Sequence, residues 1–203
     1  MSDLHGRTAL VTGGTRGIGR AVALALADAG ARVAIHGRSA AGAEAVAAEL
    51  EARGKYAGTF LADLGDSAGV VGLVAAVERQ LPAVDSVALV AGVDVLTGAA
   101  ATWPFEKKLA ALLQVDVVAT MQMVRSLGRF MAEREGGSIV TIGWDQAATG
   151  MEGDSGELFA ATKGAVMAFT KSAAKSLAPK VRVNCVAPGW IRTAWGEGAS
   201  DAW

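Results

Sequence analysis

Short apolar or β-branched runs alternate along the chain with longer segments rich in alanine and leucine. The short runs lie at residues 8–12, 32–36, 56–62, 84–90, 137–143 and 181–187, and they have the composition of buried strands. Helices are predicted between them over residues 18–30, 39–54, 67–81, 104–133 and 157–178. Ser39 is a candidate N-cap, and Gly30 and Gly54 are candidate helix ends. Strand and helix in regular alternation predict an α/β fold, a doubly wound parallel sheet with helices on both faces.

One connection is unusually long for such a fold. The polar, glycine-rich stretch from Trp144 to Gly156 joins a predicted strand to the following helix. Long loops in compact domains often carry function. No proline- or serine-rich linker interrupts the chain, so residues 1–203 are expected to form a single domain.

Composition narrows the functional classes. The net charge is −1, which gives no basic footprint for nucleic acid, and no uncharged apolar run is long enough to span a bilayer. One cysteine, Cys185, forbids an internal disulfide, and with no visible signal peptide a cytoplasmic location is expected. The two histidines, His5 and His36, are far apart, which disfavours a His/Cys metal site.

A glycine-rich loop follows the first predicted strand and opens the first helix. It reads TGGTRGIG from Thr12 to Gly19. Glycines allow the backbone to approach a pyrophosphate, and the helix N-terminus offers free N–H groups and partial positive charge. The alternative is a merely flexible turn, but the strand–loop–helix context favours a dinucleotide. The expected contacts in this loop are Gly13, Thr15, Arg16, Gly17, Ile18 and Gly19.

The ends of the next two strands indicate which dinucleotide binds. An acid after the second strand would bind a ribose hydroxyl, but the chain has Arg38 and Ser39 there. Arg38 and Arg16 could bind a 2′-phosphate, which favours NADP(H) over NAD(H), unless both are solvated surface cations. Asp63, followed by Leu64, either accepts a hydrogen bond from adenine or caps the following helix.

Together these motifs resemble the short-chain dehydrogenase/reductase family over essentially the whole chain. The resemblance also rests on Ala91-Gly92, GSIVTI, FAATKGAV and VRVNCVAPGWIRT, and it is strongest to β-ketoacyl-carrier-protein reductases and sugar dehydrogenases. It implies that Pro188, Gly189 and Ile191 line the nicotinamide, that Thr193 contacts the cofactor phosphates, and that the protein is a homo-dimer or homo-tetramer. Family sequences continue past Trp203 into a further strand and a covering helix. The chain is therefore expected to lack that last strand, or to be truncated.

The family's catalytic side chains are mostly replaced. The resemblance puts Asp116 at the asparagine position, Trp144 at the serine position and Phe159 at the tyrosine position, and only the lysine, Lys163, is retained. Phenylalanine carries no transferable proton, and an indole N–H can donate but not accept. Tyr56, the only tyrosine, is predicted in a strand away from the site.

Other groups near these positions could supply a proton. Asp145, Glu152, Asp154 and Glu157 crowd the loop and helix start before Phe159, and apolar surroundings could keep one of them protonated. The alternative is a solvated acidic loop. Lys163 is expected to hold the ribose rather than act as an acid, and Cys185 is expected to be a strand residue rather than a nucleophile. Trp190 and Trp195 are candidates to line the substrate or to pack in the core or an interface.

Two functions remain open. The favoured one is an NADP(H)-dependent reductase with a non-standard proton donor. It would act on a small molecule such as an iminium or an activated C=C, or on a ketone with Asp145 or Glu157 as the acid. The alternative is an inactive NADP(H)-binding protein that serves as a sensor or a subunit partner.

Overall fold

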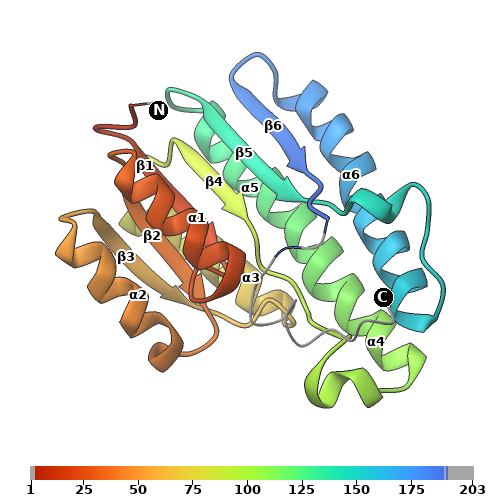
Figure 1. Ribbon diagram of the computed structural model, residues 1–203. Helices are drawn as coiled ribbons and strands as arrows, with labels where there is room; N and C mark the ends of the chain where they lie inside the picture. The colour runs from red at the N-terminus through yellow and green to blue at the C-terminus, as the bar shows by residue number, and fades with distance from the viewer. Residues whose placement is uncertain (1–2, 190, 192–203) are drawn as a thin grey trace.

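All strands in the described part of the chain lie in one parallel sheet. The computed structural model describes residues 3–189 and 191. These residues form β1 (Thr8–Thr12), β2 (Arg32–Gly37), β3 (Tyr56–Leu61), β4 (Ser86–Leu89), β5 (Gly137–Ile142) and β6 (Val181–Val186). The strand order is β3-β2-β1-β4-β5-β6, and every neighbouring pair is parallel (Figure 1). The predicted fold class and each predicted strand are confirmed.

Helices connect the strands. They are α1 (Gly17–Asp28), α2 (Ala40–Ala52), α3 (Ser67–Gln80), α4 (Phe105–Leu112), α5 (Thr120–Ala132) and α6 (Asp154–Leu177), with short 3-10 turns η1 (Gly98–Thr102) and η3 (Asp145–Ala147). Ser39 is the N-cap residue of α2, although its side chain makes no capping hydrogen bond. Gly30 and Gly54, at φ of 105° and 64°, follow the ends of α1 and α2 as predicted.

Two apolar layers cover the sheet. On one face α1 and α2 pack Ala23, Ala27, Val46 and Leu50 against Val11 and Ile35. On the other face α3, α5 and α6 pack against Leu10, Val87 and Ile139, with Met123 and Leu127 of α5 at the centre. Strand residues therefore alternate between two buried faces, which explains their near-continuous hydrophobicity.

The helical segment predicted from Pro104 to Glu133 is continuous but not uniform. A π-helical stretch, η2 (Leu113–Ala119), joins α4 to α5. Such i→i+5 turns are rare and are frequently found at functional sites. Residue composition did not indicate it, because no proline or glycine marks the position.

The helix predicted to begin at Glu157 begins three residues earlier, at Asp154. Gly153, at φ 84°, precedes the first turn, and its carbonyl accepts the Glu157 N–H at 2.9 Å. Gly156, which suggested a loop, is instead inside the helix. A glycine is needed there because a Cβ would meet the Met151 carbonyl oxygen at 2.7 Å. No helix among the described residues is long and apolar enough to cross a membrane.

Candidate functional site

The glycine-rich loop lies at the carboxyl end of β1 and packs tightly on its surroundings. A Cβ on Gly19 would come within 2.1 Å of the Gly13 carbonyl oxygen, and a Cβ on Gly13 within 2.9 Å of the Ala91 Cα. These two positions therefore exclude any side chain. The loop leads into α1 through its N-cap residue, Arg16. The loop fits the pyrophosphate of a dinucleotide. Without side chains at these glycines the backbone can approach the phosphates closely, and the N-terminus of α1 offers its free N–H groups to them.

Two buried polar side chains fasten this loop to neighbouring strands. Thr12 Oγ1 accepts the N–H groups of Val90 and Ala91 at 3.1 and 3.2 Å. His36 is 2% exposed; its Nδ1 accepts the Gly13 N–H at 3.4 Å, and its Nε2 lies 3.1 Å from the Ala62 carbonyl oxygen. A neutral ring protonated on Nε2 satisfies both contacts. Burial lowers the pKa of His36, against opposing effects of the Ala62 carbonyl and the Asp63 charge.

The residues expected near the adenosine lie together at the ends of β1, β2 and β3. Arg16, Arg38 and Ser39 are exposed, and neither arginine side chain makes a hydrogen bond within the described part of the chain. Ile18 is half-buried. Both cations are therefore accessible to an anionic group. Their binding of a 2′-phosphate stays a prediction, beside the alternative that both are solvated surface cations.

Asp63 does not cap α3. That helix is capped by Asp66, whose Oδ1 accepts the Ala68 N–H at 3.0 Å. The Asp63 carboxylate is exposed and accepts the Gly65 N–H at 2.8 Å, while Leu64 is buried in the core. The capping interpretation of Asp63 is wrong, because the chain turns for three further residues before the helix begins. Its expected contact with adenine remains a prediction.

A buried ion pair joins η2 to α6. Lys163 Nζ lies 2.7 Å from Asp116 Oδ1, and the two side chains are only 12% and 1% exposed. Asp116 Oδ2 accepts the Val93 N–H at 2.9 Å, so the carboxylate also fixes the backbone that follows β4. Gly92 leaves room for this carboxylate, since a Cβ there would lie 2.9 Å from Asp116 Oδ1. The sequence singled out both charged residues but not their direct contact.

Two aromatic rings, one in the loop after β5 and one in α6, contact each other. Trp144 follows β5, and Phe159 lies one helical turn before Lys163 in α6. Their ring centroids are 6.2 Å apart at 62°, an edge-to-face contact. Both side chains are half-buried. The positions that the resemblance assigns to two catalytic hydroxyls are thus brought together, and they present an apolar surface.

The carboxylates considered as proton donors all face solvent. Asp145, Glu152, Asp154 and Glu157 are exposed. Asp145 is the one that reaches the end of β6: its N–H donates to the Pro188 carbonyl at 3.3 Å, and a Cβ on Gly189 would lie 2.8 Å from its Oδ2.

Of the other cofactor and substrate residues predicted in this segment, the structure describes one and leaves three undescribed. Ile191 is 41% exposed. Thr193, Trp190 and Trp195 lie outside the described residues.

The other candidate groups have structural contacts. The Tyr56 hydroxyl donates to Thr59 Oγ1 at 3.0 Å within β3, and Cys185 is half-buried in β6, as expected from the sequence. No group of three or more His, Cys, Asp or Glu residues within the described ranges could hold a metal ion. Sequence reasoning missed the roles of Thr12 and His36, although a polar residue at or next to the last position of a buried strand is a usable signal for both.

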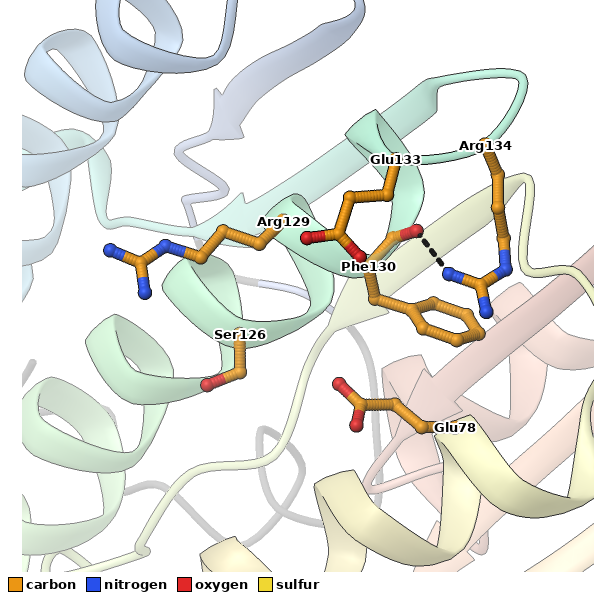
Figure 2. A pocket seen from close by; sticks show the side chains of 6 residues that line it. All are labelled: Glu78, Ser126, Arg129, Phe130, Glu133 and Arg134. Atoms are coloured by element: carbon orange, nitrogen blue, oxygen red, sulfur yellow. Dashed lines mark hydrogen bonds between the residues drawn. The ribbon is translucent and has the colours of Figure 1, made fainter.

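A hollow on the molecule lies away from these strand ends. Glu78, Ser126, Arg129, Phe130, Glu133 and Arg134 line it, between the carboxyl-terminal parts of α3 and α5 (Figure 2). Those helix ends lead into the beginnings of β4 and β5. The hollow is therefore at the amino-terminal end of the strands, opposite the glycine-rich loop. Arg134 lies over the Phe130 ring and donates to its carbonyl at 2.8 Å. The hollow is lined by both acidic and basic side chains, and no feature of it indicates a part in cofactor chemistry.

Comparison with known proteins agrees with this geometry. The short chain dehydrogenase family model matches residues 7–202. The chain is 34% identical to a 2,3-dihydro-2,3-dihydroxybenzoate dehydrogenase of Bacillus subtilis over 94% of this chain and 72% of that protein. It is 34% identical to a human 3-oxoacyl-[acyl-carrier-protein] reductase, over 90% of this chain and 75% of that one. The crystal structure of an Agrobacterium tumefaciens 3-oxoacyl (acyl-carrier-protein) reductase with NADP bound superposes with a TM-score of 0.85, at 32% identity, covering 97% and 74% of the two chains.

Proposed function

Because the chain belongs to the short chain dehydrogenase family, we propose that it is an NADP(H)-dependent oxidoreductase whose proton donor is not a tyrosine. The observation that carries this proposal is the Asp116–Lys163 pair, buried beside the strand ends that form the dinucleotide cradle. A lysine held in one place by a buried carboxylate is a preorganised cation, as expected of a working site.

The preference for NADP(H) rests on charge. Arg16 and Arg38 are exposed at the ends of β1 and β2, where an acid would select the unphosphorylated ribose. Two accessible guanidinium groups suit a 2′-phosphate, which they bind through charge-assisted hydrogen bonds. The NADP-bound relative described above has the same fold, in agreement with this assignment.

The division of roles at the reacting end follows from the contacts. When bound, NADPH supplies the hydride. Lys163 has three N–H donors, of which one points to Asp116, so two are left for the nicotinamide ribose and the substrate. Trp144 and Phe159 exclude water and offer an apolar wall to the substrate. Asp145, adjacent to Trp144 and in contact with the residues that follow β6, is the loop acid best placed to deliver a proton, which it does from its carboxylic acid form.

The aromatic wall also bears on the substrate. Reduction of a ketone needs a hydrogen-bond or proton donor to the ketone oxygen. The family uses a serine and a tyrosine hydroxyl for this, and Trp144 and Phe159 stand at those positions without a hydroxyl. An iminium cation needs only the hydride to become an amine, and an aromatic face attracts a cation. An activated C=C also accepts hydride without polarisation by a tyrosine, and the carbanion that forms takes a proton from Asp145 or from water. We therefore propose iminium ions or activated alkenes as substrates ahead of simple ketones.

The test is NADPH consumption with a panel of cyclic imines, enones and ketones, after NADPH binding has been measured by fluorescence. We expect binding, and turnover of imines or enones above that of ketones. NADPH binding without turnover of any compound would instead favour the inactive cofactor-binding protein, a function that the two aromatic replacements also suit. Absence of binding to both NADPH and NADH would overturn both functions.

A further inference from the structure

The buried pair of Asp116 and Lys163 carries no net charge. Asp116 is almost fully buried and both of its oxygens are engaged, one with Lys163 Nζ at 2.7 Å and one with the Val93 N–H at 2.9 Å. The Lys163 side chain keeps 12% of its surface exposed. The lysine is therefore the member of the pair that a bound molecule can meet, and Asp116 acts on that molecule only through its charge.

This charge decides what the lysine attracts. The asparagine expected at position 116 from the resemblance has the same size as aspartate but no charge, so it would leave the lysine unbalanced. Charges that lie a few ångströms apart near a protein surface interact strongly enough to change a binding constant by roughly tenfold or more. With aspartate at this position, the repulsion that Lys163 exerts on a cation is cancelled.

The two aromatic rings add an attraction for positive charge. Phe159 and Lys163 are four residues apart in α6, which places their Cβ atoms on one face of the helix, about 5–6 Å apart. Trp144 contacts the Phe159 ring, and both side chains are only half-buried. The faces of aromatic rings carry negative potential and attract organic cations. This surface therefore suits a positive group better than a carbonyl oxygen.

The segment that leads to these residues is acidic. Four exposed carboxylates and no lysine, arginine or histidine lie between Trp144 and Lys163. Lys108 of α4, which is buried with its Nζ 3.3 Å from Ser155 Oγ, offsets one of these charges. The remaining excess of negative charge raises the local concentration of cations. The four carboxylates are those of Asp145, Glu152, Asp154 and Glu157.

We propose that the substrate is an organic cation, an iminium ion, and that Asp116 is the specificity-determining residue that makes the site accept it. This inference rests on the proposed function for the place of hydride transfer. The iminium carbon accepts the hydride with its electron pair, and the C=N π electrons become the lone pair of a neutral amine. The positive charge passes to the oxidised cofactor and no proton moves, so Asp145 contributes its charge instead of a proton. The neutral Asp116–Lys163 pair accommodates one positive charge before and after the step.

The experiment compares a cation with its neutral isostere on the full chain saturated with NADPH. Phenyltrimethylammonium and tert-butylbenzene have the same shape and cannot accept hydride, so their dissociation constants differ through charge. Ligand-observed NMR titrations are made with the wild type, Asp116→Asn and the control Glu106→Gln, which removes one exposed carboxylate from α4. We expect the affinity of the cation relative to its isostere to fall about 10- to 100-fold in Asp116→Asn and to stay unchanged in Glu106→Gln.

A double variant separates this charge effect from a structural one. Asp116→Asn combined with Lys163→Met removes both charges, so the relative affinity for the cation should return to the wild-type value. Damage to packing alone would weaken both probes and would not be repaired by a second substitution. A relative affinity that does not fall in Asp116→Asn, or that stays low in the double variant, would overturn the role of Asp116.

Turnover by the wild type does not depend on the folding of any variant. With NADPH saturating, kcat/KM for an N-methylated dihydroisoquinolinium ion, a permanent iminium, should exceed that for neutral cyclohexenone. Only the value for the cation should fall several-fold as salt rises from about 20 mM to about 500 mM. Faster reduction of cyclohexenone would overturn the cationic substrate but leave the proposed oxidoreductase intact, and a salt-independent cation rate would contradict the part of the acidic segment.

Failure of the proposed function has a different signature. Absence of NADPH binding, or NADPH binding without turnover of any compound, concerns that function. A cation preference that Asp116→Asn removes would still support the role of Asp116 in either case, because probe binding does not require turnover.

Discussion

Lys163 Nζ and Asp116 Oδ1, from α6 and from the π-helical turn, lie 2.7 Å apart in a contact that is almost fully shielded from water. The resemblance to the family leads one to expect an asparagine at the Asp116 position. The acid changes the local electrostatics, because it places a formal negative charge directly on the retained lysine. The lysine is then positioned by an ion pair rather than by a neutral amide.

The pair is expected to contribute to stability as a unit. Asp116→Asn and Lys163→Met each leave one buried charge uncompensated, so each should lower the free energy of unfolding by about 3 kcal/mol. The double variant should lose clearly less than the sum of the two, in urea denaturation followed by circular dichroism. Additive losses would show that the two side chains do not interact energetically.

Restoring the hydroxyls should create ketone reduction. Phe159→Tyr with Trp144→Ser supplies a proton donor next to Lys163, and general acid catalysis typically contributes about 10²–10⁴-fold. Ketone-dependent NADPH oxidation should rise by that order. The control adds Lys163→Met to the same background and should lose the gain. If NADPH still bound and no ketone were reduced, the rest of the site would not be competent for this chemistry.

Arg38→Ala should change cofactor choice. Loss of a charge-assisted contact to the 2′-phosphate should weaken NADPH binding about 10- to 100-fold and leave NADH binding unchanged, as measured by fluorescence titration. Arg20→Ala is the matched control, because Arg20 lies in the same region but is engaged with Glu49 at 2.6 and 3.1 Å. An equal loss for both cofactors would mean that Arg38 does not read the phosphate.

His36 should make stability depend on pH. Its pKa is lowered in the fold by burial, so the folded state favours the neutral ring. The unfolded chain binds the proton first as pH falls below about 6.5, and stability is therefore intact above that pH and is lost as pH falls toward the folded pKa.

The measurement compares melting temperatures at about pH 7.5 and about pH 5.5 for the wild type and His36→Gln. Glutamine can keep the bond to the Ala62 carbonyl but does not titrate. The wild type should lose more stability on acidification than the variant, together with NADPH affinity, because protonation of Nδ1 removes the acceptor for the Gly13 N–H. Identical pH profiles would contradict this role.

The sheet, its helices and the glycine loop were predictable because their signals are local. Alternating apolar runs, Gly30 and Gly54 at helix ends, and glycines between a strand and a helix each have one physical explanation. Contacts between distant segments were not predictable. The sequence offered Asp116 and Lys163 separately, and nothing in it indicated that Lys108 would be buried against Ser155 while Lys107 remained exposed. The start of α6 was misplaced because Gly156 was taken as a loop residue, although it is required by close packing on Met151.

The π-helical turn has a consequence for the whole segment from Phe105 to Ala132. An i→i+5 turn changes the angular phase of the helix, so the side-chain stripe of α4 does not continue as the stripe of α5. Leu112 faces the small cluster with Leu158, while Met123 and Leu127 face the central core. One continuous helical segment thereby contributes side chains to two separate hydrophobic clusters. A single-residue deletion within the π-helical turn would rotate α4 relative to α5, so that the apolar faces of both helices could not meet their clusters at once.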